Sequence, residues 1–213
     1  ILRYGLPSGF QNSVIGFANV VVQSNINAFG ELAMSGCGAY AKVEGFAFLP
    51  ITSFTSAITT FVGQNLGAEE FDRAKKGARF GILCSLLIAE GIGVITSVFS
   101  PVFIGAFCDS QAAIAFGVDK AHICALFFCL LAATHCLSAV LRGAGRAMVP
   151  MVVMLSVWCV LRVSILWIAV PITQSINTVN WVYPITWSIS TVVLLIYYRK
   201  SDWLHSFQRE KAK

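Results

Sequence analysis

The stretch FGILCSLLIAEGIGVITSVFSPVF, residues 80–103, decides the class of this protein. It is almost wholly apolar and contains a single charged residue, Glu90. A helix rises about 1.5 Å per residue, so a stretch of this length can cross the roughly 30 Å of hydrocarbon in a bilayer. Four Lys and Arg residues between positions 73 and 79 would hold its first end at the cytoplasmic surface. The segment therefore predicts a membrane-spanning helix.

Five further apolar segments predict five more spans. Hydrophobic residues make up 57% of the chain and charged residues 12%, which is too little charge for the surface of a soluble domain. Strands of a membrane β-barrel would be shorter and would alternate apolar with polar side chains. The sequence therefore predicts an all-α membrane protein, with a six-helix transmembrane lobe over residues 1–200 and a basic tail over residues 201–213. The predicted spans are residues 7–29, 36–63, 80–103, 121–141, 149–171 and 181–198.

The Lys and Arg residues orient these spans. Twelve of the fifteen lie before the first span, in alternate gaps, or after the last span. Because cations are retained on the cytoplasmic side, this pattern predicts that both ends of the chain lie in the cytoplasm. We expect the protein in the plasma membrane. Topology accounts for the basic residues, so the net charge of +5 gives no reason to expect nucleic acid as a partner. Within the polar gap over residues 64–79, the run over residues 68–76 predicts a short amphipathic helix on the cytoplasmic face.

The sequence gives no support to an enzyme. Its seven cysteines lie mostly inside predicted spans and form no Cys-x-x-Cys pair, so small buried side chains are their expected role. Cys129, His135 and Cys136 match no zinc spacing. The sequence also shows no phosphate-binding loop and no nucleophile–base arrangement. We expect no catalytic residue, no metal site and no cofactor.

Polar residues recur along one face of the first predicted span. At about 100° per residue they form a stripe about a quarter of the helix wide. Amides cannot face lipid, because their donors and acceptors would be unpaired. The stripe either bonds neighbouring helices or forms a wall of a hydrated solute cavity, and we favour the cavity slightly. The candidates for a substrate pathway are Asn12, Asn19, Gln23 and Asn27.

Ionisable side chains inside predicted spans are costly to bury and therefore suggest a site or a paired partner. Lys42 and Glu44 are two residues apart, so they point to nearly opposite sides of their helix. Lys42 can extend toward the interface. Glu44 is a candidate for binding a coupling cation or proton, although an ion pair with Arg162 or Lys42 has comparable weight.

Three other ionisable residues receive different interpretations. Arg162 lies in the middle of a span and needs a partner, and Trp158, one turn earlier, can stack on its guanidinium. His135 is expected to be a hydrogen-bonded packing residue, with a proton relay as the minority alternative. Lys120 lies beside Asp119 just before a predicted span, so we expect an interfacial charge.

The stretch Thr60-Phe61-Val62-Gly63-Gln64-Asn65-Leu66-Gly67-Ala68 resembles the multidrug and toxic compound extrusion (MATE) family. Further matches occur in order along essentially the whole chain, and they correspond to the carboxy-terminal half of the family, helices seven to twelve. The resemblance implies one lobe of a twelve-helix MATE-type transporter, with an amino-terminal six-helix lobe missing from this chain. These further matches are Gly5-Leu6-Pro7, Asn27-Ala28-Phe29-Gly30, Leu141-Arg142-Gly143-Ala144-Gly145 and Tyr183-Pro184-Ile185-Thr186-Trp187.

The resemblance implies a secondary active exporter of drugs, xenobiotics or organic cations, driven by H⁺ or Na⁺ through alternating access. Its implied partners are amphipathic or cationic small molecules, the lipid bilayer and the missing lobe. One branch of the family couples through acids in helices seven and ten, but this chain has Leu131 near the second position. It therefore resembles the other branch, whose coupling Asp lies in the amino-terminal lobe, and Glu44 is the best acidic candidate that remains. The alternative is a lipid-linked oligosaccharide flippase of the same broader superfamily, for which Lys42 and Arg162 are few cations.

Overall fold

The computed structural model describes the backbone of residues 2–205, together with their side chains apart from residues 2–8 and 10–12. This part of the chain is helical throughout, with short connections and no strand. The elements in chain order are α1 (Leu2–Asn27), α2 (Glu31–Gly67), α3 (Phe71–Val98), α4 (Ser100–Gly105), α5 (Gln111–Cys124), η1 (Ala125–Phe127), α6 (Phe128–Gly143), α7 (Met148–Met154), η2 (Leu155–Leu161), α8 (Arg162–Thr173) and α9 (Ile176–Lys200).

Six long helical rods account for the six predicted spans. Within the described residues, five of them are long and apolar enough to cross a membrane: α2, α3, α5 to α6, α7 to α8, and α9. The sixth rod, α1, has 26 residues and is long enough, but its polar stripe makes it less apolar than the others. The all-helical membrane architecture is thus confirmed, and the membrane crossing of α1 stays a prediction.

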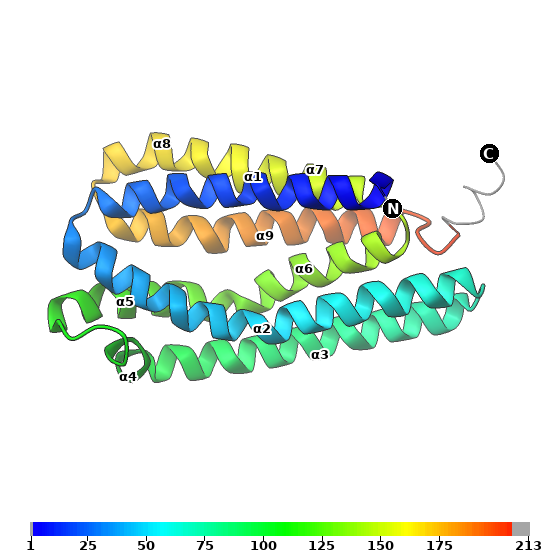
Figure 1. Cartoon of the computed structure of the whole chain (residues 1–213), viewed down its shortest axis with the longest axis horizontal. Coiled ribbons are helices and arrows are strands. Elements are labelled where there is room, and N and C mark those ends of the chain that lie inside the picture. Colours follow the sequence, from blue (N-terminus) through cyan, green and yellow to red (C-terminus); the bar gives the residue numbers. More distant parts are fainter. Residues whose placement is uncertain (1, 206–213) are drawn as a thin grey trace.

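The cation-bearing connections gather at one end of the bundle. The α2–α3 turn, the α6–α7 turn and the end of α9 all lie at the end where α1 begins (Figure 1). Arg146 ties two of these segments together, because its Nη1 donates to the Tyr197 hydroxyl at 2.9 Å and its Nη2 donates to the Asp202 carbonyl oxygen at 3.1 Å. The first residues of the predicted tail also pack here, since the Trp203 ring stacks on Tyr198 with centroids 5.4 Å apart. The basic residues of the tail lie outside the described residues.

The prediction of a separate amphipathic helix over residues 68–76 is wrong. Instead, α2 continues to Gly67 and α3 begins at Phe71, so both membrane helices project beyond their apolar segments. The chain reverses direction between them at Glu69, whose φ of 61° lies in the left-handed region. The sequence of α3, from Phe71 to Val98, has no proline, so its first polar turns extend the membrane helix rather than forming a separate element.

Two of the rods are interrupted. A 3₁₀ turn, η1, separates α5 from α6, and a π-helical segment, η2, separates α7 from α8. At the first interruption Gly93 of α3 lies against the backbone of Ala125, where a Cβ would collide with the Ala125 carbonyl oxygen. Short 3₁₀ and π segments inside membrane helices redirect the residues that follow them. Both interruptions lie close to the cavity described below.

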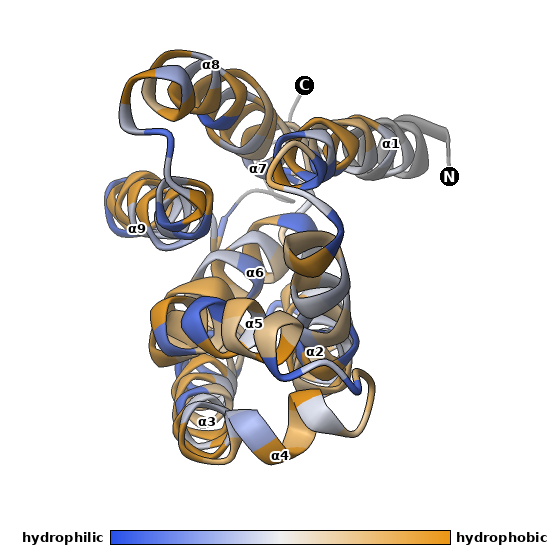
Figure 2. Cartoon of the chain, turned by 90° about the vertical axis from the view of Figure 1, so that its left-hand side faces the viewer, coloured by the Kyte–Doolittle hydropathy of each residue, from blue (hydrophilic) through white to orange (hydrophobic). Residues whose placement is uncertain are grey.

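The rods form two groups. Figure 2 shows α1, α8 and α9 on one side, and α2, α3, α5 and α6 on the other. Backbones approach closely within the second group, because Gly36 of α2 and Gly117 of α5 face each other and a Cβ on Gly117 would lie 2.7 Å from the Gly36 carbonyl oxygen. Contacts of α9 with α5 and α6 connect the two groups. Buried side chains such as Tyr40 and Phe128 fill the core between them.

Candidate functional site: a polar cavity between the helix groups

A cavity of about 470 Å³ lies between the two helix groups. Its walls come from α1, α2, α5, α6, η2, α8 and α9. Aromatic rings, amides and three charged side chains share this lining, which is a combination typical of sites that bind amphipathic molecules. The lining residues are Ile15, Asn19, Gln23, Ala41, Glu44, Gly45, Phe48, Lys120, Leu131, His135, Trp158, Arg162, Tyr183 and Trp187.

Arg162 is the most deeply buried charge of the cavity, with 1% of its surface exposed. It is the first residue of α8, directly after the π-helical segment. Its guanidinium carbon lies 5.0 Å from the ring centroid of Trp158 and 4.7 Å from that of Tyr183, so the predicted contact with Trp158 is confirmed. Its Nη2 donates to the Thr186 hydroxyl at 2.8 Å. Two aromatic faces and a hydroxyl thus offset part of the cost of burying this cation.

Lys120 is the second buried cation, and the prediction of an interfacial charge is wrong. The side chain is only 4% exposed, because α5 already begins at Gln111 and carries Lys120 more than two turns into the helix. Its Nζ lies 4.9 Å from the Tyr183 ring centroid and 5.5 Å from the Tyr40 ring centroid. Tyr183 therefore contacts both buried cations.

The sequence did contain a signal for the burial of Lys120. Ala113, Gly117 and Cys124 lie seven and three residues before it and four residues after it, and all three are buried. This spacing follows one face of a helix, and small residues on such a face allow close helix packing. Lys120 belongs to this packed face, whereas its neighbour Asp119 does not line the cavity.

Glu44 is half-buried and is the one carboxylate in the described lining of the cavity. It interacts electrostatically with Lys120 and Arg162, yet among the described residues neither cation forms a direct ion pair with it. Lys42 lies on the other side of α2, where it is exposed and its Nζ is 5.2 Å from the Phe107 ring centroid. The structure thus separates Lys42 from Glu44, as their spacing predicts.

His135 packs among aromatic rings at the cavity wall. Its ring meets those of Phe48 and Trp158 edge to face, with centroid distances of 5.0 and 5.6 Å. Its Nε2 atom is buried and has no hydrogen-bond partner among the described residues, although the sequence predicts a hydrogen-bonded histidine. The Trp158 ring is itself fixed, because its Nε1 donates to the Ser190 hydroxyl at 2.8 Å.

The amide stripe of α1 contributes two of its four candidates to the cavity. Asn19 and Gln23 line it. Asn27 lies at the end of α1 and accepts a hydrogen bond from Gln23, whose Nε2 is 2.9 Å from its Oδ1. Asn12 is part of α1, but its side chain lies outside the described residues. Asn19 and Gln23 are exposed within the described lobe, which suits a surface that faces a solute or water.

Glu90, for which the sequence predicts no role, supports this site without lining the cavity. Its Oε2 accepts a hydrogen bond at 3.0 Å from the backbone nitrogen of Cys129, the second residue of α6. The first N–H groups of a helix have no partner within the helix, and in a membrane an unpaired group is expensive. Glu90 therefore stabilises the start of α6, and with it the relative positions of Lys120 before the break and His135 after it.

The family model described as MatE matches residues 7–168, which is more than half of the chain. The probable multidrug resistance protein YoeA of Bacillus subtilis (strain 168) is 25% identical over 93% of this chain and 43% of its own length. The probable multidrug resistance protein NorM of Thermotoga maritima is 30% identical over 74% of this chain and 34% of its own length. The chain thus spans less than half the length of these curated relatives.

Solved structures show the same fold. A MOP superfamily transporter from Pyrococcus furiosus superposes with a TM-score of 0.86 at 18% identity, over 93% of this chain and 45% of that one. The reverse polarity of the binding pocket of that transporter has been taken to suggest a different function. The outward-facing form of a multidrug resistance MATE family transporter gives 0.85 at 19% identity over the same shares. The chain is therefore a member of the MatE family of membrane transporters, which are not enzymes, and it forms one lobe of their fold.

Proposed function

We propose that this chain is the carboxy-terminal lobe of a secondary active exporter in the plasma membrane, which carries amphipathic compounds outward in exchange for H⁺ or Na⁺. The observation that carries the proposal is the cavity in which Glu44 lies near two buried cations and a set of aromatic rings. The curated relatives named above are described as probable multidrug resistance proteins, which supports drugs or other xenobiotics as the solutes. A second six-helix lobe would complete the pathway and allow alternating access.

The exposure of the three charges favours solutes that carry a positive group. Lys120 and Arg162 are almost completely buried, and their charged ends lie over the rings of Tyr40, Trp158 and Tyr183. Glu44 is the more accessible charge, so a solute in the cavity meets a carboxylate, amides and aromatic faces. An anionic lipid would need accessible cations, whereas the two cations that line this cavity, Lys120 and Arg162, are almost completely buried. The arrangement thus supports drug export over the flippase alternative.

The same carboxylate gives a physical basis for exchange. A proton or Na⁺ bound at Glu44 would compete with a positively charged solute for the same carboxylate. Competition of two ligands for one site is the simplest way to couple the transport of the ion to the transport of the solute. The nearby cations Lys120 and Arg162 weaken the binding of any positive ligand to Glu44. Weak binding favours release, which a transporter needs at the end of each cycle. We therefore propose that Glu44 takes part in ion coupling.

The test is Glu44→Gln in the full-length transporter, reconstituted in vesicles with separate proton and sodium gradients. Coupling energies between two ligands typically correspond to about 5–150-fold in affinity, so we expect efflux of an amine-bearing dye to fall at least about fivefold. The matched control is Glu31→Gln, which removes an exposed carboxylate from the first turn of the same helix. Efflux of the Glu44 variant that equals the control under both gradients would remove Glu44 from the pathway.

A further inference from the structure

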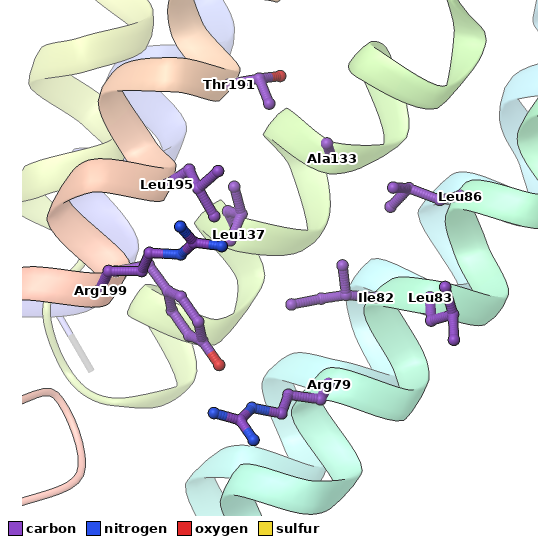
Figure 3. A pocket seen from close by; sticks show the side chains of 10 residues that line it. Arg79, Ile82, Leu83, Leu86, Ala133, Leu137, Thr191, Leu195 and Arg199 are labelled. Atoms are coloured by element: carbon purple, nitrogen blue, oxygen red, sulfur yellow. The ribbon is translucent and has the colours of Figure 1, made fainter.

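A second cavity, also of about 470 Å³, lies outside the solute site. It is a groove between α3, α6 and α9, shown in Figure 3, and none of its described lining comes from α1, α2 or α8. Ala133 and Leu137 of α6 form part of the wall between Leu86 of α3 and Leu195 of α9. The groove therefore belongs to a different surface of the lobe from the polar cavity.

The surroundings of the groove are suited to lipid. Phe80 and Leu83 of α3 are 70% and 57% exposed, and Val192 and Ile196 of α9 are 55% and 50% exposed. Apolar side chains with this exposure on membrane-crossing helices contact acyl chains in a bilayer. The groove is thus an apolar surface depression, and the side chains at its edges face the hydrocarbon of the bilayer.

One end of the groove carries two cations. Arg79 of α3 and Arg199 of α9 approach the groove from opposite sides (Figure 3), and both are exposed. Arg79 also interacts electrostatically with Tyr198, which lines the groove beside it. These residues lie at the end of the bundle where the cation-bearing connections gather, next to the level at which lipid headgroups are expected.

We propose that this groove binds one anionic phospholipid, with its phosphate between Arg79 and Arg199 and an acyl chain along Leu86 and Ala133. Guanidinium groups are opposite in charge to a phosphate and match its hydrogen-bond geometry. Basic residues beside a membrane helix attract anionic lipids of the cytoplasmic leaflet. The apolar wall of the groove suits a hydrocarbon tail. The basic end and the apolar end of the groove would therefore bind the headgroup and the acyl chain of one lipid molecule.

The first experiment measures lipid binding to the full-length transporter by native mass spectrometry. The protein is titrated with phosphatidylglycerol and, separately, with phosphatidylcholine. The test variant is Arg79→Gln with Arg199→Gln. The control is Arg73→Gln with Lys200→Gln, which removes two exposed cations from the same helices without touching the groove. One basic residue near an anionic leaflet corresponds to about a fivefold gain in affinity, so the test variant is expected to bind phosphatidylglycerol about 30-fold more weakly.

Equal losses in the test and control variants would overturn the proposal, because they would indicate a diffuse surface charge. Unchanged binding in the test variant would also overturn it. A second variant, Ala133→Trp, fills the groove without changing the net charge and is expected to reduce binding of both lipids. A further test places one cysteine at Leu83 and a second one on the other lobe or on a second copy of the chain. If these cysteines cross-link and no lipid is bound, protein covers this groove and the lipid site is refuted.

Discussion

The hydrogen bond between Glu90 and the start of α6 leads to a prediction about stability. Replacing Glu90 by leucine removes the acceptor that lies 3.0 Å from the Cys129 nitrogen. The N–H group then has no partner, because it lies in the first turn of α6 where the helix supplies none. Glu90→Gln keeps a carbonyl oxygen at the same distance along the side chain, so it serves as the matched control.

The expected magnitude follows from the loss of one acceptor. A buried donor left without a partner costs about 1–3 kcal/mol, whereas exchange of one acceptor for another costs less than about 1 kcal/mol. For a domain of this size, 1 kcal/mol corresponds to about 2–4 °C in melting temperature. We therefore expect Glu90→Leu to lower the melting temperature by about 2–12 °C, and Glu90→Gln to lower it by less than about 4 °C.

The assay is thermal unfolding of the full-length protein in detergent, followed by intrinsic fluorescence and by size-exclusion chromatography after heating. The five tryptophans of this chain include Trp158 and Trp187 at the polar cavity, so the fluorescence signal reports on the region that the α5–α6 break positions. Equal losses in the two variants would show that the carboxylate acts through its charge rather than as an acceptor. An unchanged melting temperature in Glu90→Leu would refute the argument altogether.

Two further predictions test the packing and the cavity. Gly36→Ala places a Cβ against a backbone carbonyl of α5 and should lower the free energy of unfolding by about 1–3 kcal/mol, measured by the same thermal assay. Gly38→Ala is the control, because its Cβ would meet nothing within 4 Å, and it should leave the stability unchanged. Cysteines at Asn19 and Gln23 should react with water-soluble thiol reagents in the full-length protein, whereas one at the buried Ala18 should not; equal reaction at all three positions would contradict the cavity.

Long apolar segments made the helical membrane fold predictable, because their length and lack of charge leave few other structures. Cation spacing likewise predicted that alternate connections lie at one end. The burial of Lys120 was missed because the predicted span began at residue 121, whereas α5 begins at Gln111, ten residues earlier, and places Lys120 on its packed face of small residues. The role of Glu90 was missed for a related reason, since nothing before residue 128 indicates that α6 begins there with an unpaired N–H group.

The amide stripe shows a different limit. Its period correctly predicted that Asn19 and Gln23 share a face, and the structure adds which surface that face meets. Glu44 and Arg162 are far apart in the sequence, and only the packing of α2 against the other helices brings them to one cavity. Periodicity determines which side chains of one helix lie together, whereas the grouping of side chains from different helices depends on tertiary contacts.

The π-helical segment Leu155–Leu161 has an evolutionary consequence. A π segment is equivalent to one extra residue within an α-helix, and each residue of a helix turns the chain by about 100°. If a relative lacks that extra residue, its alignment with this chain must contain a one-residue gap between Met154 and Arg162. An ungapped alignment would instead pair Arg162 with a residue on the wrong face. The arginine of this lobe should therefore be compared across relatives only after the gap is placed by structure.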